Sequence, residues 1–149
     1  MNDTTQKDDA PETPPGCDLA IAAEAFYITN MILAPGLGFL MLLMLYRHCS
    51  SKGSPIIAMN HLRQTFMATM WTAIIGLVFA VLIFLTGGYP SDWFWPLLGV
   101  YFIGFHIPLS WMGIMGLNKA LEGKSYCYPF VGCRLLEDKQ ALGKRAVAQ

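Results

Sequence analysis

Charged residues are scarce in this chain of 149 residues. Asp, Glu, Lys and Arg make up 13% of it, about half the share of a soluble domain, whereas hydrophobic residues make up 54%. This balance excludes a disordered chain and a nucleic-acid module with a basic face, and four cysteines are too few for a disulfide-dense secreted scaffold. The apolar residues form long blocks, so the composition predicts an all-α protein of a lipid bilayer.

Motifs of common catalytic sites are also missing. The sequence contains no G-x-S-x-G elbow, no P-loop, no H-E-x-x-H zinc motif and no dinucleotide-binding fingerprint. We therefore expect no enzymatic activity, no cofactor and no nucleic-acid partner.

Three apolar blocks are long enough to cross a bilayer, since about 20 helical residues at 1.5 Å each span roughly 30 Å. They cover residues 19–46, 65–85 and 93–117. The first block has one charge, Glu24, near its start, and Pro35-Gly36 within it predicts a kink. The sequence thus predicts a transmembrane three-helix bundle over residues 19–135.

The two tails differ in charge. Residues 1–18 carry five acidic residues against Lys7 alone, together with three prolines, which predicts a disordered acidic tail. This tail does not resemble a signal peptide, which begins with basic residues followed at once by an apolar run. Residues 136–149 are expected to form a cytoplasmic basic tail.

Basic residues near the ends of the spans predict the orientation. None lies in the turn 86–92 between the second and third spans. The residues expected to contact lipid or a partner at the inner surface are Arg47, Lys52, His61, Arg63, Lys119 and Lys124. The sequence therefore predicts a multi-pass protein of the bacterial inner membrane, with the N-terminus outside and the C-terminus in the cytoplasm.

The second span carries a face of small side chains. Ala68, Thr72, Gly76 and Ala80 recur at every fourth position, which lets another helix backbone approach closely. Two interpretations remain open, packing within the chain and an interface with another subunit.

His106 is the most notable polar residue of the third span. A histidine near the middle of a span must face the bundle interior and find a partner, and Asn30 of the first span is a candidate. The alternatives are a neutral histidine that satisfies a helix kinked at Pro108, and a proton relay or ligand contact.

Haem and metal sites have weaker support. His48 and His61 differ in depth from His106 by roughly 15 Å, so these residues cannot be the axial ligands of one haem. Near the inner surface, His48, Cys49, Cys127 and Cys133 supply four ligand atoms without the usual zinc spacing. Reduced thiols are the default for these cysteines, with lipid attachment as a further alternative.

Two segments carry a family resemblance. Residues 54–66 read SPIIAMNHLRQTF, and residues 116–130 read GLNKALEGKSYCYPF. Over about residues 20–135 the chain resembles the small bacterial membrane proteins of the domain-of-unknown-function 4870 family. In that family a His, basic, Gln or Glu and Phe pattern opens the second span, and Tyr-Pro follows the third. This chain departs from the pattern at Leu121-Glu122-Gly123, which replaces the usual Asn-Gly pair.

The resemblance implies a three-span fold and no particular chemistry. The family is similar to the import-channel component of the chloroplast inner envelope and includes proteins of the magnetosome membrane. We expect an accessory or structural subunit that packs in the bilayer with other membrane-protein subunits or as a homo-oligomer. The alternatives are a component of an oligomeric transport or protein-translocation channel, and a small redox or metal-binding subunit.

Overall fold

The computed structural model describes residues 14–129 and residue 131, and every regular element in this part of the chain is helical. The order is α1 (Cys17–Ile32), α2 (Leu37–Lys52), α3 (Ile56–Leu85), α4 (Phe94–Tyr101), the π-helix η1 (Phe102–His106) and α5 (Ile107–Leu121). Most of the predicted acidic tail and the whole predicted basic tail lie outside the described residues. The helix α1 begins at Cys17, within the range predicted as tail.

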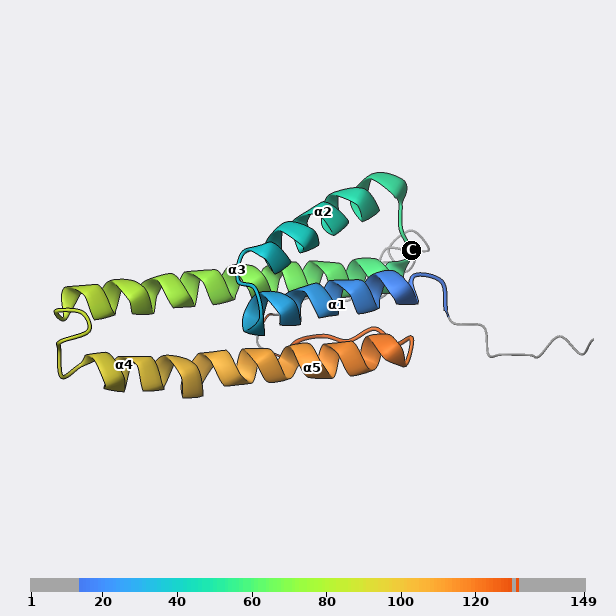
Figure 1. The fold of residues 1–149 in the computed structure, drawn as a ribbon. Coiled ribbons are helices and arrows are strands. Elements are labelled where there is room, and N and C mark those ends of the chain that lie inside the picture. The colour runs from blue at the N-terminus through green and yellow to red at the C-terminus, as the bar shows by residue number, and fades with distance from the viewer. Residues whose placement is uncertain (1–13, 130, 132–149) are drawn as a thin grey trace, which may run out of the picture.

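Two antiparallel rods form the long axis of the molecule (Figure 1). One is α3, with 30 residues, and the other is the continuous run α4–η1–α5, with 28 residues. Both are long and apolar enough to cross a membrane. They contain the predicted block 65–85 and all but the first residue of the block 93–117, and α3 begins earlier than predicted, at Ile56. The first half of α3 is the more polar one, and its residues His61, Gln64 and Thr65 are buried against other elements rather than exposed to solvent.

The prediction that residues 19–46 form one kinked span is wrong. The chain instead reverses between α1 and α2, which have 16 residues each, and α2 returns toward the end at which α1 begins (Figure 1). Pro35 has no N–H to continue a helix, and Gly36 adopts a φ of 92°, which is accessible to glycine. A turn forms here rather than a kink.

The side chain of Asn30 stabilises this turn. Its Oδ1 accepts hydrogen bonds from the backbone N–H groups of Gly36 at 2.8 Å and Phe39 at 3.1 Å. Both donors belong to the first turn of α2 and would otherwise have no partner within the helix. A Cβ on Gly38 would lie only 2.5 Å from the backbone nitrogen of Asn30, so the two helices meet backbone to backbone.

The start of α1 lies at the same end of the molecule as the start of α3 and the end of α5. Gly16 sits against Pro55 and Ala58, and the Cys17 thiol donates to the carbonyl of Ala120 at 2.9 Å. A first block that crossed the molecule once would have placed the start of α1 at the far end, near Trp93. The start of α1 and the end of α5 thus lie at the same end of the molecule, whereas the sequence predicts an N-terminus outside and a C-terminus in the cytoplasm.

The predicted small-residue face is used only in part within the chain. Ala68 and Thr72 are buried against α1, and Thr72 approaches the sulfur of Met31 at 3.9 Å. Farther along α3, Gly76 faces the Tyr101 hydroxyl and Ala80 is exposed. The face therefore packs inside the molecule over its first half and remains open over its second half.

The irregularity near Pro108 takes the form of a π-helix. The N–H of Ile107 bonds to the carbonyl of Phe102, five residues earlier, at the end of η1. Since Pro108 cannot donate to the preceding turn, the wider helix accommodates the missing hydrogen bond and turns His106 away from the usual helical register.

Candidate functional site

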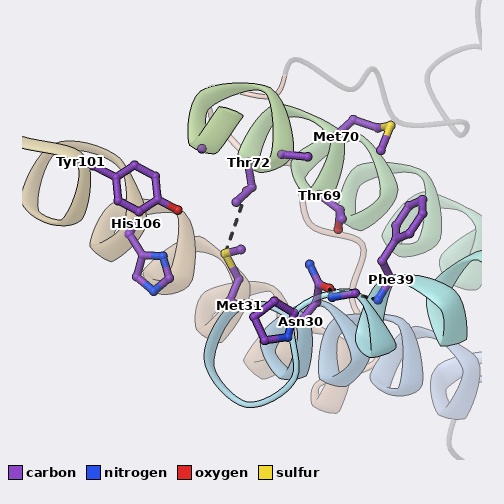
Figure 2. A pocket seen from close by; sticks show the side chains of 12 residues that line it. Asn30, Met31, Phe39, Thr69, Met70, Thr72, Tyr101 and His106 are labelled. Atoms are coloured by element: carbon purple, nitrogen blue, oxygen red, sulfur yellow. Dashed lines mark hydrogen bonds between the residues drawn. The ribbon is translucent and has the colours of Figure 1, made fainter. Parts of the chain in front are cut away.

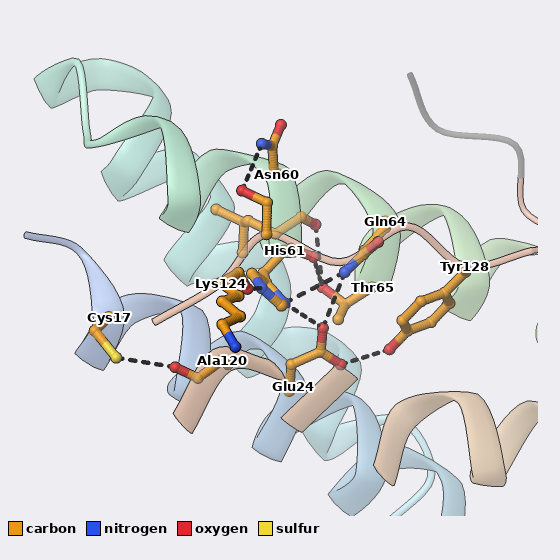
Figure 3. Close-up of polar contacts among 11 residues, drawn as sticks. Cys17, Glu24, Asn60, His61, Gln64, Thr65, Ala120, Lys124 and Tyr128 are labelled. Carbon is orange, nitrogen blue, oxygen red and sulfur yellow. Dashed lines mark hydrogen bonds and ion pairs between the residues drawn. The ribbon is translucent and has the colours of Figure 1, made fainter. Parts of the chain in front are cut away.

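The carboxylate of Glu24 is the centre of a buried polar cluster (Figure 3). We call Glu24, His61, Gln64 and Tyr128 the Glu24 cluster. Its members come from α1, α3 and the segment after α5, and each side chain is fully buried. The helix α1 brings Glu24 to α3 because the two helices run side by side in the same direction (Figure 1).

Both carboxylate oxygens of Glu24 are occupied. Oε1 lies 2.7 Å from Nδ1 of His61 and accepts from Nε2 of Gln64 at 3.2 Å. Oε2 accepts from the hydroxyl of Tyr128 at 2.5 Å. A buried carboxylate with partners on both oxygens is stabilised in place rather than open to a substrate.

His61 connects the cluster to the backbone of the last segment. Its Nε2 lies 2.9 Å from the carbonyl oxygen of Lys124, which only accepts, so Nε2 carries a hydrogen. One further proton lies between Nδ1 of His61 and Oε1 of Glu24, and the pair is neutral overall wherever this proton resides. The cluster therefore adds hydrogen bonds to the interior without adding net charge.

Tyr128 closes the cluster from the segment that follows α5. Burial of the phenol, followed by the nearby charge of Glu24, raises the pKa of Tyr128 above its ordinary value of 10.0. Its hydroxyl consequently stays protonated and donates to Glu24. The Tyr128 and Tyr27 rings lie 6.0 Å apart, and the Tyr27 hydroxyl donates to the carbonyl of Leu109 at 3.1 Å.

Two glycines on α5 make room for these side chains. A Cβ on Gly116 would lie 2.6 Å from the carboxyl group of Glu24, and one on Gly113 would lie 2.7 Å from the ring of Tyr27. Such distances are shorter than van der Waals contact, so α5 reaches α1 this closely only with glycine at both positions.

A mostly apolar pocket that contains several polar groups lies beside the α1–α2 turn (Figure 2). We call it the mid-helix pocket. It has a volume of about 410 Å³ and is formed by the end of α1, the start of α2, the middle of α3, Tyr101 and His106. The pocket contains both predicted members of the buried polar site, Asn30 and His106.

The structure does not pair these two residues with each other. The Oδ1 of Asn30 is occupied by the backbone of α2, as described above. His106 lies against the rings of Tyr101 and Phe102, at centroid distances of 5.9 and 5.0 Å. Its buried Nδ1 has no hydrogen-bond partner among the described residues.

The predicted inner-surface residues fall into two groups. His61 is buried in the Glu24 cluster, so its assignment as a lipid or partner contact is wrong. Arg47, Lys52 and Lys124 are exposed, and Arg63 and Lys119 are partly exposed. Glu122 pairs with Lys119 and Lys124, at 3.0 Å each, and these bonds lower the pKa of its carboxyl group.

The cysteines form no metal site in the described part of the chain. Cys17 and Cys49 are buried, Cys127 is exposed, and Cys133 lies outside the described residues. Residues 14–129 and 131 contain no group of three or more His, Cys, Asp or Glu side chains that could hold a metal ion.

Sequence reasoning missed the Glu24 cluster, although a signal for it was present. A carboxylate within an apolar helix requires a partner, and His61 and Gln64 stand one helical turn apart on another apolar helix. From the sequence, Glu24 stands out only as the one charge of the first apolar block, near its start. Comparison with protein-family models, with curated proteins and with solved structures gives no match.

Proposed function

We propose that the protein is a multi-pass subunit of the bacterial inner membrane, without enzymatic activity, that works by packing against partner chains or further copies of itself. The two long apolar rods support the membrane location. Large apolar side chains are exposed along both rods, as expected for helices that face lipid or another helix.

The distribution of charge supports an orientation with both described ends in the cytoplasm. Cytoplasmic ends of membrane helices carry the excess of basic residues, and tryptophans favour the interface. The turn between α3 and α4 has no basic residue, ends with Trp93 and is followed closely by Trp95. Basic residues gather at the opposite end, namely Arg47, Lys52, Arg63, Lys119 and Lys124.

The α1–α2 turn is the observation that carries the proposal. It lies beside Thr69 and Thr72, close to the middle of α3, and would therefore sit near the centre of the bilayer. Leu33 in this turn is 77% exposed, and Pro35 and Gly36 are exposed as well. Irregular backbone within hydrocarbon is tolerated only when protein or a water-filled cavity covers it. A partner helix at this position would provide that cover.

Photo-crosslinking in native membranes tests the proposal. A photoreactive residue in place of Leu33 is expected to crosslink to another polypeptide. The matched control is the same residue in place of Phe84, which is 80% exposed near the far end of α3. Absence of a protein crosslink at Leu33, together with a monomeric mass in mild detergent, would contradict a packing function.

The mid-helix pocket favours a second candidate, a component of an oligomeric transport or translocation assembly. Short helices that meet near the bilayer centre beside a pocket with polar groups are typical of transport sites. In that case water rather than protein covers the turn. A Leu33→Cys variant would then react with a water-soluble maleimide in intact cells, whereas a protein-covered or lipid-facing thiol would remain unmodified.

A further inference from the structure

The mid-helix pocket contains polar groups that no part of the described chain satisfies. The buried Nδ1 of His106 has no hydrogen-bond partner there, and neither the hydroxyl of Tyr101 nor the amide NH₂ of Asn30 makes a hydrogen bond within residues 14–129. Figure 2 shows the Tyr101 hydroxyl pointing toward the middle of the pocket. A buried polar atom without a partner, such as Nδ1 of His106, is costly in an apolar setting and so indicates a missing partner. The Tyr101 hydroxyl and the Asn30 amide line the same pocket and are available to the same ligand.

Each of these groups can donate a hydrogen to a ligand, His106 in the tautomer whose hydrogen lies on Nδ1. The amide nitrogen of Asn30 can only donate, because the acceptor oxygen of the same side chain is already occupied by α2. A tyrosine hydroxyl donates readily, and a neutral histidine ring carries one N–H. The complementary ligand is therefore one that presents acceptor oxygens.

The rest of the lining is uncharged and mostly apolar, since the hydroxyls of Thr69 and Thr72 already donate to carbonyls of their own helix. Met31, Pro35, Phe39 and Met70 contribute to the walls, and no Asp, Glu, Lys or Arg lines the pocket among the described residues. A charged ligand would find no counter-ion here and would lose its hydration. A volume of about 410 Å³ lies in the range of small-molecule sites and suits a single ring or a short chain.

The depth of the pocket in the bilayer further restricts which ligands can reach it. The lining residues of α3 run from Thr69 to Gly76, around the middle of this 30-residue helix. Ester carbonyls of phospholipids lie near the headgroups, about 15 Å from the bilayer centre. A ligand at this depth must itself dissolve in the hydrocarbon core.

We propose that the mid-helix pocket binds a neutral, membrane-soluble carbonyl compound, such as a quinone-type ring, whose oxygens accept hydrogen bonds from Tyr101, His106 or Asn30. The π-helix η1 contributes by turning His106 toward the pocket, as π-helical turns often do at binding sites. This site requires only one chain in a bilayer and does not depend on subunit packing.

Binding can be measured on the full chain in lipid nanodiscs. The probe is a fully substituted para-benzoquinone with a short alkyl tail, which does not alkylate thiols, and the matched control is the alkylbenzene with the same tail. We expect saturable binding of the quinone at least about tenfold tighter than that of the alkylbenzene, since one or two hydrogen bonds distinguish them. In histidine-selective nitrogen NMR the ring signals of His106 should shift, while those of His48 and His61 should not.

Two variants assign the site. Tyr101→Phe keeps the ring and should raise the Kd by about 3- to 10-fold, the effect of one hydrogen bond, and His106→Leu should raise it similarly. Tyr89→Phe, at the exposed α3–α4 turn, should leave the Kd unchanged. The proposal is overturned if the quinone does not bind saturably, if the alkylbenzene binds equally well, or if Tyr101→Phe, folded as judged by thermal unfolding, binds as the unmodified chain does.

Discussion

Gly116 of α5 stands directly against the carboxyl group of Glu24 on α1. A methyl group at this position would lie 2.6 Å from the carboxyl carbon and from both oxygens. Because Glu24 is held by His61 on one oxygen and by Tyr128 on the other, it cannot move aside without breaking one of these contacts. The Glu24 carboxylate therefore fits between the helices only because position 116 of α5 is a glycine.

The first prediction concerns Gly116→Ala. We expect the free energy of unfolding to fall by about 1–3 kcal/mol, because the added methyl group forces overpacking around a fixed carboxylate. Thermal unfolding of the detergent-purified protein measures the loss. The control is Gly99→Ala, where a Cβ meets nothing within 4 Å, and alanine should leave stability unchanged or slightly raised. Equal effects of the two substitutions would contradict the close approach at Gly116.

The second prediction concerns the buried pair itself. Glu24→Ala should lower the free energy of unfolding by about 3–5 kcal/mol, because it leaves His61, Gln64 and Tyr128 buried without their acceptor. The control, Glu122→Gln, removes an exposed carboxylate from two lysines and should have little effect, since solvent screens that interaction. A Glu24→Ala protein as stable as the control would show that the cluster is not structural.

The third prediction concerns the reversal between α1 and α2. Asn30→Ala removes the acceptor of two backbone N–H groups and should destabilise the hairpin by about 1–2 kcal/mol. Hydrogen exchange of residues 36–39 should become faster, while exchange in α5 remains unchanged. Thr29→Ala, one residue earlier on the same helix, is the control and should leave exchange at the turn as it was.

The fourth prediction is a pH dependence from Tyr128. Its raised pKa means that the folded chain keeps the phenolic proton at pH values where the unfolded chain releases it. The stability that this adds is complete below the ordinary pKa of 10.0 and is lost as the pH rises above it, by up to about 1.4 kcal/mol per pH unit. The stability difference between the unmodified chain and Tyr128→Phe should therefore shrink above pH 10. Tyr89→Phe, which changes an exposed tyrosine, should show no such trend.

The fifth prediction concerns orientation. Because α1 begins beside the end of α5, reporters fused to either end of the chain should both report the cytoplasm. A reporter inserted after Gly88, in the α3–α4 turn, should report the periplasm. A periplasmic signal from the N-terminal fusion alone would mean that α1 and α2 form a single crossing helix in the membrane.

Much of the helical architecture is readable from local composition. The blocks 65–85 and 93–117 consist of apolar residues, and apart from Trp93 both lie within the long helical rods. The interruption at Pro35-Gly36 was also visible, but proline permits both a kink and a reversal. The reversal is selected over the kink by the capping of α2 by Asn30 and by the close backbone approach at Gly38. Both contacts depend on how the two helices meet.

The Glu24 cluster shows the limit of reasoning along the chain. An isolated carboxylate in an apolar helix demands a partner, and that demand follows from solvation alone. The identity of the partners does not, since His61 lies 37 positions away and Tyr128 lies 104 positions away. Residue types thus establish apolar helices, a break at Pro35-Gly36 and a buried acid in need of donors. Which donors reach it, and at which end of the molecule α1 begins, depend on helix packing, because contacts between distant segments leave no periodic trace in the sequence.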